Sequence, residues 1–223
     1  MNGNMVQCRF QNQAVAGARI RRNAAQPQRK GGENMRFTNC EFDVCSHGLA
    51  VEEHQWLIVE SCLFDYCALP IYLLGSWYAK IEKSYVGVSN VPRTTFASVP
   101  GAEFPGANGI ALYGLCNVPE GQPVSVTAVN CEFVNYIAGT NQPIVYINGY
   151  GNSGQPQMGY ETTFDDCLFY CPEVHSAPRI LDIAYCRVAR VTNNRFSSYN
   201  RSSTLEDAYS TSNCQDYMNF RIS

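Results

Sequence analysis

Two pairs of acidic residues recur at a fixed spacing and are the first candidates for acid–base chemistry. Asp43 and Asp65 lie 22 residues apart, and Glu60 and Glu82 repeat the same interval. If the repeats stack, such residues face outward on neighbouring coils about 4.8 Å apart. That distance is near the roughly 5 Å that separates the two carboxyl groups of retaining glycosidases, and clustered carboxylates also bind calcium. Asp182 is a third, isolated candidate.

The same carboxylates have an ordinary explanation as surface charge. No Arg or Lys shares the predicted column of Asp43 and Asp65, although a polysaccharide lyase needs a base beside its acidic residues. Charges on exposed strands are more often solvated than catalytic. The sequence therefore offers Asp43, Asp65 and Asp182 as catalytic candidates without a complete catalytic set.

Tyrosines recur along a different predicted strand and are candidates for binding. The outward column of that strand is predicted to contain Ala50, Tyr72, Ala111, Tyr146 and Asp182, and the neighbouring column Glu52, Leu74, Tyr113, Asn148 and Ala184. Tyrosine rings can stack on sugar rings, and they can equally pack on one another across strands. Because the face is aromatic and weakly charged, it suits glycan binding better than glycan cleavage. The predicted binding residues are Tyr72, Tyr113, Tyr146 and Asp182.

The chain has 11 cysteines, an odd number, and most lie inside apolar segments. Five of them stand two residues before a Phe, namely Cys8, Cys40, Cys62, Cys131 and Cys167. Small residues inside an apolar stack are ordinary packing, so we expect a ladder of reduced, buried thiols.

Cys45 and Cys67 also lie 22 residues apart, and His47 is nearby. A disulfide or a metal pair is geometrically possible there, and the sequence leaves open whether the two cysteines pair. Two Cys and one His fall short of a full zinc set. We therefore predict no metal site and no cofactor.

These residues belong to one repeated motif: a small polar residue, Cys or another small residue, any residue, and then Phe. Full copies are Asn39–Phe42, Ser61–Phe64, Asn130–Phe133, Asp166–Phe169 and Asn193–Phe196, with a weaker copy at Lys83–Val86 and a partial copy at Gln7–Phe10. Upstream of each copy, apolar residues alternate in two short runs, such as Leu49 and Val51, then Leu57 and Val59. Period-two alternation indicates strands with one buried face. Each unit of about 22 residues or more thus contains three short strands.

A bend is expected immediately before the Cys position of each motif. The bend residues are Asn39, Ser61, Lys83, Asn130, Asp166 and Asn193. Asn and Asp tolerate the left-handed backbone region better than other residues with a side chain. We therefore predict a positive φ at this corner, and at Asn130 in particular.

Three strands per turn, a left-handed Asn at one corner and aligned Cys and Phe inside resemble the pectate-lyase-like superfamily of parallel β-helices, a fold also found in phage tail spikes. The resemblance is one of architecture and covers about residues 5–196, without a family-specific catalytic motif. It implies an all-β fold class, a single right-handed parallel β-helix of about seven coils with three short strands per coil. Residues 1–223 then form one domain, with 197–223 as a terminal coil or C-terminal extension.

Some coils contain extra residues that interrupt the repeat. Segments 22–34, 115–123 and 148–159 fall between the first and second strand of their coils, and segment 88–108 falls at another corner. Insertions on a solenoid form loops on one face, which is often the binding face.

Composition restricts the partners and the location. The formal net charge is −3, which argues against a general nucleic-acid binder. The apolar runs are too short for a membrane-spanning helix, and the first residues lack the pattern of a signal peptide. We expect no nucleic acid and no membrane insertion, with synthesis in a cytoplasm and a final place on a virion or another extracellular surface.

Two functions from different classes remain open. The first is a non-enzymatic structural or adhesive β-helix module of a virus or phage particle or other outer surface, with glycan binding as one role. The second is a polysaccharide lyase or glycoside hydrolase. Strand edges at the ends of a solenoid invite pairing, and no capping helix is evident in the sequence. We therefore expect a homo-oligomer or a component docked to other proteins of a larger particle, with aromatic residues such as Tyr150, Tyr160 and Phe104 as anchors.

Overall fold

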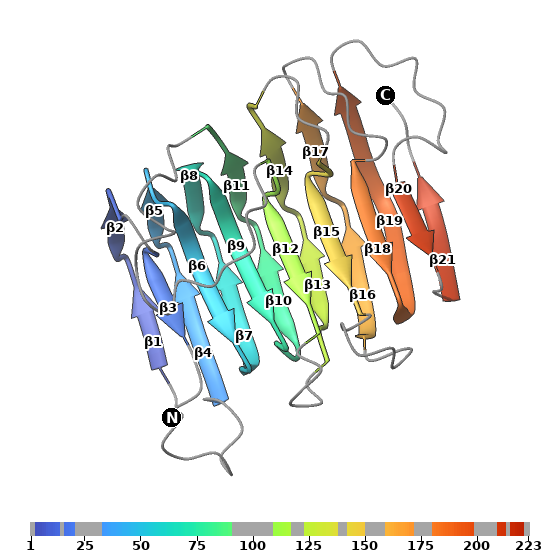
Figure 1. Ribbon diagram of the computed structural model, residues 1–223, viewed down its shortest axis with the longest axis horizontal. Coiled ribbons are helices and arrows are strands. Elements are labelled where there is room, and N and C mark those ends of the chain that lie inside the picture. The colour runs from blue at the N-terminus through green and yellow to red at the C-terminus, as the bar shows by residue number, and fades with distance from the viewer. Residues whose placement is uncertain are drawn as a thin grey trace.

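The chain winds around one axis in successive coils and forms a parallel β-helix (Figure 1). The computed structural model describes residues 3–13, 16–20, 33–90, 109–116, 123–137, 142–149, 159–171, 180–198, 209–212 and 215–220. These residues contain strands and no helix. Each coil adds one short strand to each of three parallel sheets, which confirms the predicted right-handed β-helix with three strands per coil.

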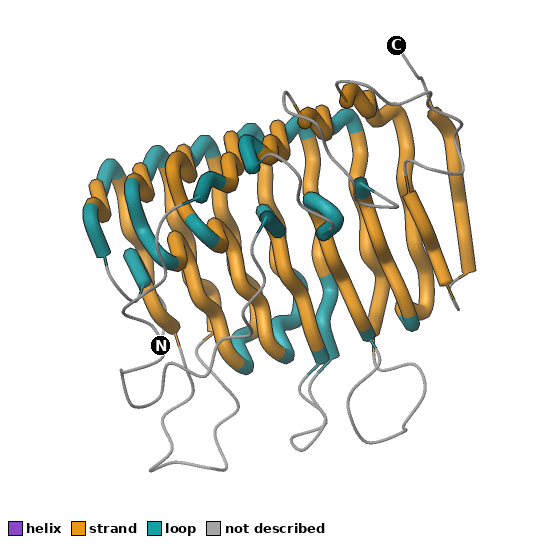
Figure 2. The backbone as a smooth tube through the Cα atoms, turned by 45° about the horizontal axis from the view of Figure 1, so that its top comes forward, coloured by secondary structure: helices purple, strands orange, loops and turns teal. Residues whose placement is uncertain are grey.

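The three sheets, named here A, B and C, follow one another around each coil (Figure 2). Sheet A contains β1 (Gly3–Val6), β4 (Glu33–Thr38), β7 (Gln55–Glu60), β10 (Ala79–Glu82), β13 (Val126–Val129), β16 (Gly159–Asp165), β19 (Cys186–Ser198) and β21 (Gln215–Phe220). Sheet B contains β2 (Arg9–Gln11), β5 (Glu41–Asp43), β8 (Leu63–Cys67), β11 (Tyr85–Val88), β14 (Glu132–Asn135) and β17 (Leu168–Cys171). Sheet C contains β3 (Ala18–Ile20), β6 (His47–Glu52), β9 (Leu69–Leu74), β12 (Leu112–Leu115), β15 (Val145–Asn148), β18 (Leu181–Ala184) and β20 (Tyr209–Ser212).

Apart from the strands at the ends of each sheet, every strand pairs in parallel with its counterparts in the coils before and after it. The seven strands of sheet C follow the order β20-β18-β15-β12-β9-β6-β3. Strand β19 belongs to two sheets, because it pairs with β16 as far as Thr192 and with β17 from Arg195 onward. The C-terminal strands β20 and β21 continue sheets C and A.

The corner between sheets A and B has the predicted left-handed backbone. Asn130 has φ 52°, and the other five predicted bend residues, Asn39, Ser61, Lys83, Asp166 and Asn193, have φ between 49° and 55°. One residue in this conformation turns the chain from one strand to the next. The sequence therefore places the corner correctly in all six coils for which it was predicted.

Aromatic side chains inside the solenoid stack along its axis. Phe10, Phe42 and Phe64 form one stack, with ring centroids 4.7 and 4.5 Å apart. Phe133, Phe169 and Phe196 form a second stack at 5.3 and 4.9 Å. The ring of Phe64 also requires Gly48, since a Cβ at that position would come within 2.6 Å of the ring.

One coil departs from the register that the apolar pattern predicts. Leu112 pairs with Ile71, and Gly114 occupies the inward position opposite Leu73. The expected alignment put Ile110 and Leu112 there, two residues too early. Gly114 does not contribute to the apolar pattern because it has no side chain. A Cβ at this position would come within 2.7 Å of Ile147.

The predicted insertions lie largely outside the described residues. Within the predicted insertions 22–34, 115–123, 148–159 and 88–108, the undescribed residues are 22–32, 117–122, 150–158 and 91–108. The first three insertions follow a strand of sheet C and precede a strand of sheet A, and the fourth follows β11. The proposed anchors Tyr150 and Phe104 also lie outside the described part of the chain.

Candidate functional site

The three candidate tyrosines form one column on the outer face of sheet C. Tyr72 of β9 pairs with Tyr113 of β12, which pairs with Tyr146 of β15. Their ring centroids are 6.0 and 5.3 Å apart, and the planes are nearly parallel at 15° and 17°. The prediction that Tyr113 lies in the neighbouring column, with Ala111 in its place, is wrong, because of the two-residue register difference at Gly114.

The stacking decides which parts of the rings a ligand can reach. Both faces of Tyr113 are covered by its neighbours, and Tyr72 is 3% exposed. Tyr113 and Tyr146 are half-buried, so their edges and hydroxyl groups are the groups available to a sugar. Burial raises the pKa of Tyr72 and Tyr113, with Glu52 and Tyr146 respectively adding to the effect, and neutral phenols can donate hydrogen bonds.

Polar residues stand at both ends of the tyrosine column. Arg19 shares the column through Ala50 and contacts Glu52 through Nε at 3.0 Å and Nη2 at 2.8 Å. At the other end, Asp182 pairs with Tyr146. Asn148 donates a hydrogen bond to the Tyr146 hydroxyl at 2.8 Å. The column thus combines aromatic edges with charged and amide groups, the mixture that recognises hydroxylated ligands.

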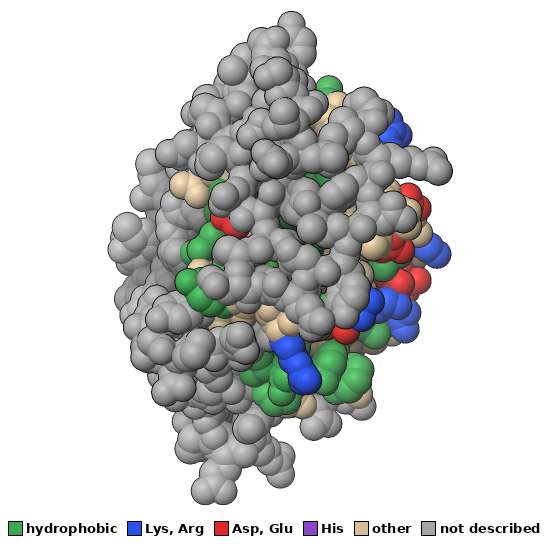
Figure 3. Space-filling view, turned by 90° about the vertical axis from the view of Figure 1, so that its right-hand side faces the viewer, with side chains coloured by type: hydrophobic (Ala, Val, Ile, Leu, Met, Phe, Trp, Pro, Cys, Tyr) green, Lys and Arg blue, Asp and Glu red, His purple; other side chains and the backbone are tan. Residues whose placement is uncertain are grey.

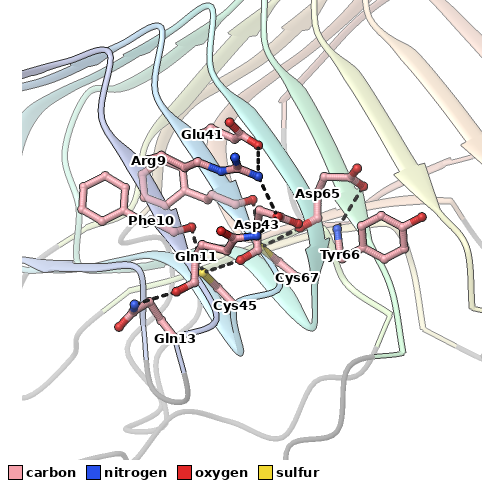
Figure 4. A network of polar contacts seen from close by, with 11 residues as sticks. Arg9, Phe10, Gln11, Gln13, Glu41, Asp43, Cys45, Asp65, Tyr66 and Cys67 are labelled. Carbon is pink, nitrogen blue, oxygen red and sulfur yellow. Dashed lines mark hydrogen bonds and ion pairs between the residues drawn. The ribbon is translucent and has the colours of Figure 1, made fainter.

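The second candidate site, around Asp43 and Asp65, lies on the outer face of sheet B (Figure 4). The two aspartates pair in register on β5 and β8, and Gln11 of β2 precedes them in the same column. Gln11 Nε2 donates to Asp43 Oδ2 at 2.9 Å. Asp65 Oδ1 accepts the backbone N–H of Tyr66 at 2.9 Å.

An arginine from the adjacent column reaches the first aspartate. Arg9 Nη2 lies 3.2 Å from Asp43 Oδ2 and 3.1 Å from Glu41 Oε1 (Figure 4). Aligning the sequence by columns did not predict this contact, because the long side chain of Arg9 reaches from its own column to Asp43 in the next one. The structure brings Asp43 and Asp65 together on sheet B. Asp182 lies on sheet C and is not part of this site.

The other acidic column, on sheet A, is paired with cations of the same face. Arg36 Nη2 lies 2.6 Å from Glu60 Oε2, and Lys80 Nζ lies 2.7 Å from Glu82 Oε1. In the end view, basic and acidic side chains lie side by side along one flank of the molecule (Figure 3). The ion pairs of Glu60 and Glu82 link side chains on the surface of sheet A, which agrees with the explanation that these carboxylates are ordinary surface charge.

The predicted thiol ladder is present and buried. Cys40, Cys62, Cys131 and Cys167 are 1–3% exposed, and Cys8 of the first coil is half-buried. Ser84 and Asn194 replace Cys in two coils, and their side-chain oxygens accept the backbone N–H of Cys62 and Cys167 at 3.1 and 2.8 Å. Burial raises the pKa of Cys62 to about 11. Because all four thiols are buried, the ladder is a structural feature of the core.

Cys45 and Cys67 form a second stack of thiols inside the sheet B–C corner, and both are free. Their sulfurs donate to the backbone carbonyls of Phe10 and Phe42, at 3.5 Å in each case. A hydrogen bond with Cys45, and then burial, raise the pKa of Cys67. His47 is buried and meets Tyr72 edge to face at 6.4 Å.

The sequence analysis did not identify Trp56 and Tyr78 as candidate site residues. Both are half-exposed and stack on each other at 4.6 Å. They lie 22 residues apart, so the same interval that identified the acidic pairs was the signal that could have found them.

Within the described residues, no group of three or more His, Cys, Asp or Glu side chains could hold a metal ion. The same part of the chain contains no helix that is long and apolar enough to cross a membrane. Comparison of the sequence with protein-family models and curated proteins, and of the structure with solved structures, found no match.

Proposed function

We propose that this chain is a non-enzymatic structural or adhesive module, a β-helix of the pectate-lyase-like kind that forms part of a virus or phage particle or another outer surface. Glycan binding at the edges of the tyrosine column on sheet C is its adhesive role. The proposed binding residues are Tyr113, Tyr146 and Asp182, with Tyr72, which is 3% exposed, supporting the ring stack behind them.

The observation that carries this proposal is the pairing of the candidate catalytic carboxylates. Asp43 accepts hydrogen bonds from Gln11 and Arg9, and Asp65 accepts one from its own strand. A glycosidase needs one carboxyl group that keeps its proton near neutral pH and a second that is free to attack. Asp43 Oδ2 already contacts Arg9 at 3.2 Å and Gln11 at 2.9 Å, so this carboxylate is committed to its neighbours on the surface and is poorly placed to act on a sugar.

The first coil supports the proposed assembly with other chains. Among the described residues, β1 pairs with β4, β2 with β5 and β3 with β6, each on one side. Met5 and Val6 in this coil are apolar and are 37% and 48% exposed, which suits contact with another protein. We propose a homo-oligomer or docking to other proteins of a particle.

The test combines binding, cleavage and assembly. The purified chain should bind to immobilised oligosaccharides, and Tyr113→Ala and Tyr146→Ala should weaken that binding. Acidic polysaccharides incubated with it, with or without calcium, should show no rise in near-ultraviolet absorbance from an unsaturated product. Sedimentation should reveal an oligomer. Cleavage that Asp43→Asn abolishes would overturn the proposal.

One observation favours the enzymatic alternative. Arg9 places a guanidinium group 3.2 Å from Asp43, and a polysaccharide lyase uses a carboxylate and a basic side chain at one sugar. In such a lyase, Asp43, Asp65 and Arg9 would form the active site. Asp182 would not belong to it. Loss of any measured cleavage in both Arg9→Ala and Asp43→Asn would identify that site.

A further inference from the structure

Both tryptophans of the chain lie at the corner where sheet C turns into sheet A. Trp56 is in β7, and Trp77 lies one coil later, just before β10, where it forms a bridge with Gln55. Trp56 stacks on Tyr78 with a centroid distance of 4.6 Å and an interplanar angle of 18°. Their exposed fractions are 50% and 47%, so about half of each ring faces solvent.

The backbone at these two positions is unfavourable for large side chains. Trp56 has φ 61° and Tyr78 has φ 54°, in the left-handed region where a bulky residue is an outlier. The position one coil earlier is Asn34, with φ 56°, because Glu33 pairs with Gln55 and Met35 with Leu57. Asn suits this conformation.

The core gains little from rings that are half-exposed, so burial does not explain why aromatic residues occupy strained positions. The solenoid uses left-handed residues to turn its corners, and residues in such conformations also cluster at functional sites. Two stacked, half-exposed rings on this backbone are therefore candidates for a binding role.

Further aromatic surface extends from this pair along the helix axis. Trp77 meets Tyr160 edge to face at 5.9 Å, and Tyr160 is 39% exposed. Four aromatic residues from three coils, those of β7, β10 and β16, thus lie at or beside one corner. Flat aromatic surface presented to solvent in this way is a common feature of ligand-binding sites.

Among the described residues, uncharged amide side chains stand directly beside the pair, which suits a neutral ligand. Asn34, which precedes Trp56 in the same column, is exposed, and Gln55 beside it is half-buried. Both side chains carry amide donors and acceptors. Lys80, two residues after Tyr78, is already paired with Glu82 at 2.7 Å.

We propose that Trp56 and Tyr78 bind the pyranose ring of a neutral glycan. The electron-rich face of an aromatic ring attracts the positively polarised C–H groups on one face of a sugar, and Asn34 and Gln55 supply hydrogen bonds to its hydroxyl groups. This inference rests on the proposed adhesive function for its class of ligand, and it assigns a glycan site at a corner away from the tyrosine column.

Tryptophan fluorescence gives a direct test, since both tryptophans report on this corner. The full chain is titrated with neutral and acidic oligosaccharides, and the emission shift is measured for wild type, Trp56→Asn and Tyr78→Asn. Asn is the residue that the chain itself uses at the equivalent position, so both variants should melt at or above the wild-type temperature. Each should weaken binding of a neutral oligosaccharide at least tenfold. Tyr66→Asn is the control, because Tyr66 is 57% exposed with φ 50° at another corner.

The outcomes separate this site from the proposed function. Binding of a neutral sugar that is lost in Trp56→Asn and Tyr78→Asn but kept in Tyr66→Asn supports the inference. Glycan binding that only Tyr113→Ala and Tyr146→Ala weaken overturns it and leaves the proposed function standing. An emission shift that follows self-association of the chain without sugar overturns it too, and assigns the pair to an interface between copies.

Discussion

The ring of Phe64 lies face to face on the ring of Phe42, with parallel planes and centroids 4.5 Å apart. The two residues are 22 positions apart in the sequence and pair in register on β5 and β8. Both are fully buried. This contact repeats from coil to coil and links the sequence motif directly to the packing of the solenoid.

Truncation of Phe64 should destabilise the protein strongly. Phe64→Ala leaves a cavity between Phe42 and the next coil, and we expect the free energy of unfolding to fall by about 3–5 kcal/mol. Leu63→Ala on the same strand is the matched control, because Leu63 is 38% exposed, and it should change stability by about 0.5 kcal/mol. Urea unfolding of both variants measures the difference, and equal effects would contradict the coil packing.

The left-handed corner predicts opposite effects for two substitutions of one residue. Asn130 is exposed and has φ 52°. Asn130→Ala should lower the free energy of unfolding by about 1 kcal/mol, because a Cβ disfavours this conformation and Ala lacks the amide that compensates in Asn. Asn130→Gly should leave stability nearly unchanged or raise it. Thermal unfolding distinguishes them, and a less stable Gly variant would contradict the assignment of strain to the corner.

The thiols should differ in reactivity according to burial. Cys40, Cys62, Cys131 and Cys167 should react slowly with a thiol reagent at pH 8, because reaction needs exposure and thiolate character and the pKa of Cys62 is about 11. Cys8, which is half-buried, should react first among these five. Timed labelling followed by peptide mass spectrometry gives the order. Early labelling of Cys131 or Cys167 in the folded protein would disprove the buried ladder.

His54 should make the protein sensitive to mild acid. The side chain is 2% exposed, and neither ring nitrogen has a hydrogen-bond partner among the described residues. Burial lowers its pKa from 6.5 to about 4. The unfolded chain therefore binds a proton near pH 6.5 that the folded protein takes up only near pH 4. Stability should be constant above pH 6.5 and fall between pH 6.5 and 4, by on the order of 3 kcal/mol.

Substitution isolates this contribution from that of the carboxylates. The variant His54→Gln does not titrate in this range, so its stability should decline less between pH 6.5 and 4 than that of the wild type. Chemical unfolding at half-unit pH steps provides the comparison. Parallel curves for the two proteins would show that His54 is not the acid-sensitive group.

The sequence predicted the parts of the fold that repeat at a short interval. Phe, Cys and Asn at fixed offsets located the inward positions and the left-handed corner, because each of these residue types has one physical reason to be there. The register was wrong at Gly114, where the inward position is filled by Ile147 and its neighbours rather than by a side chain of its own. A pattern of apolar residues cannot find a position that is occupied from the next coil.

The candidate sites were harder to predict than the coils. The sequence predicted tyrosines on the outer face of sheet C. It did not predict that all three stack, because Gly114 hides the register of β12 from the apolar pattern. The contact between Arg9 and Asp43 crosses from one column to another, which alignment by column does not show. Trp56 and Tyr78 were not predicted as site residues because large aromatic residues are expected in the core. Their left-handed backbone conformation is seen only in the structure.

The unequal lengths of the coils have a consequence for how the chain folds. Phe42 and Phe64 are joined by a loop of 22 positions, whereas Ala79 and Val126 pair across 47. Closing the longer loop costs about 0.7 kcal/mol more in chain entropy, and in a solenoid each coil needs only its neighbour as a template. Folding should therefore begin in residues 33–88, where successive coils contain no inserted segment, and proceed outward in both directions. Hydrogen exchange should accordingly find the slowest amides in β7 and β8.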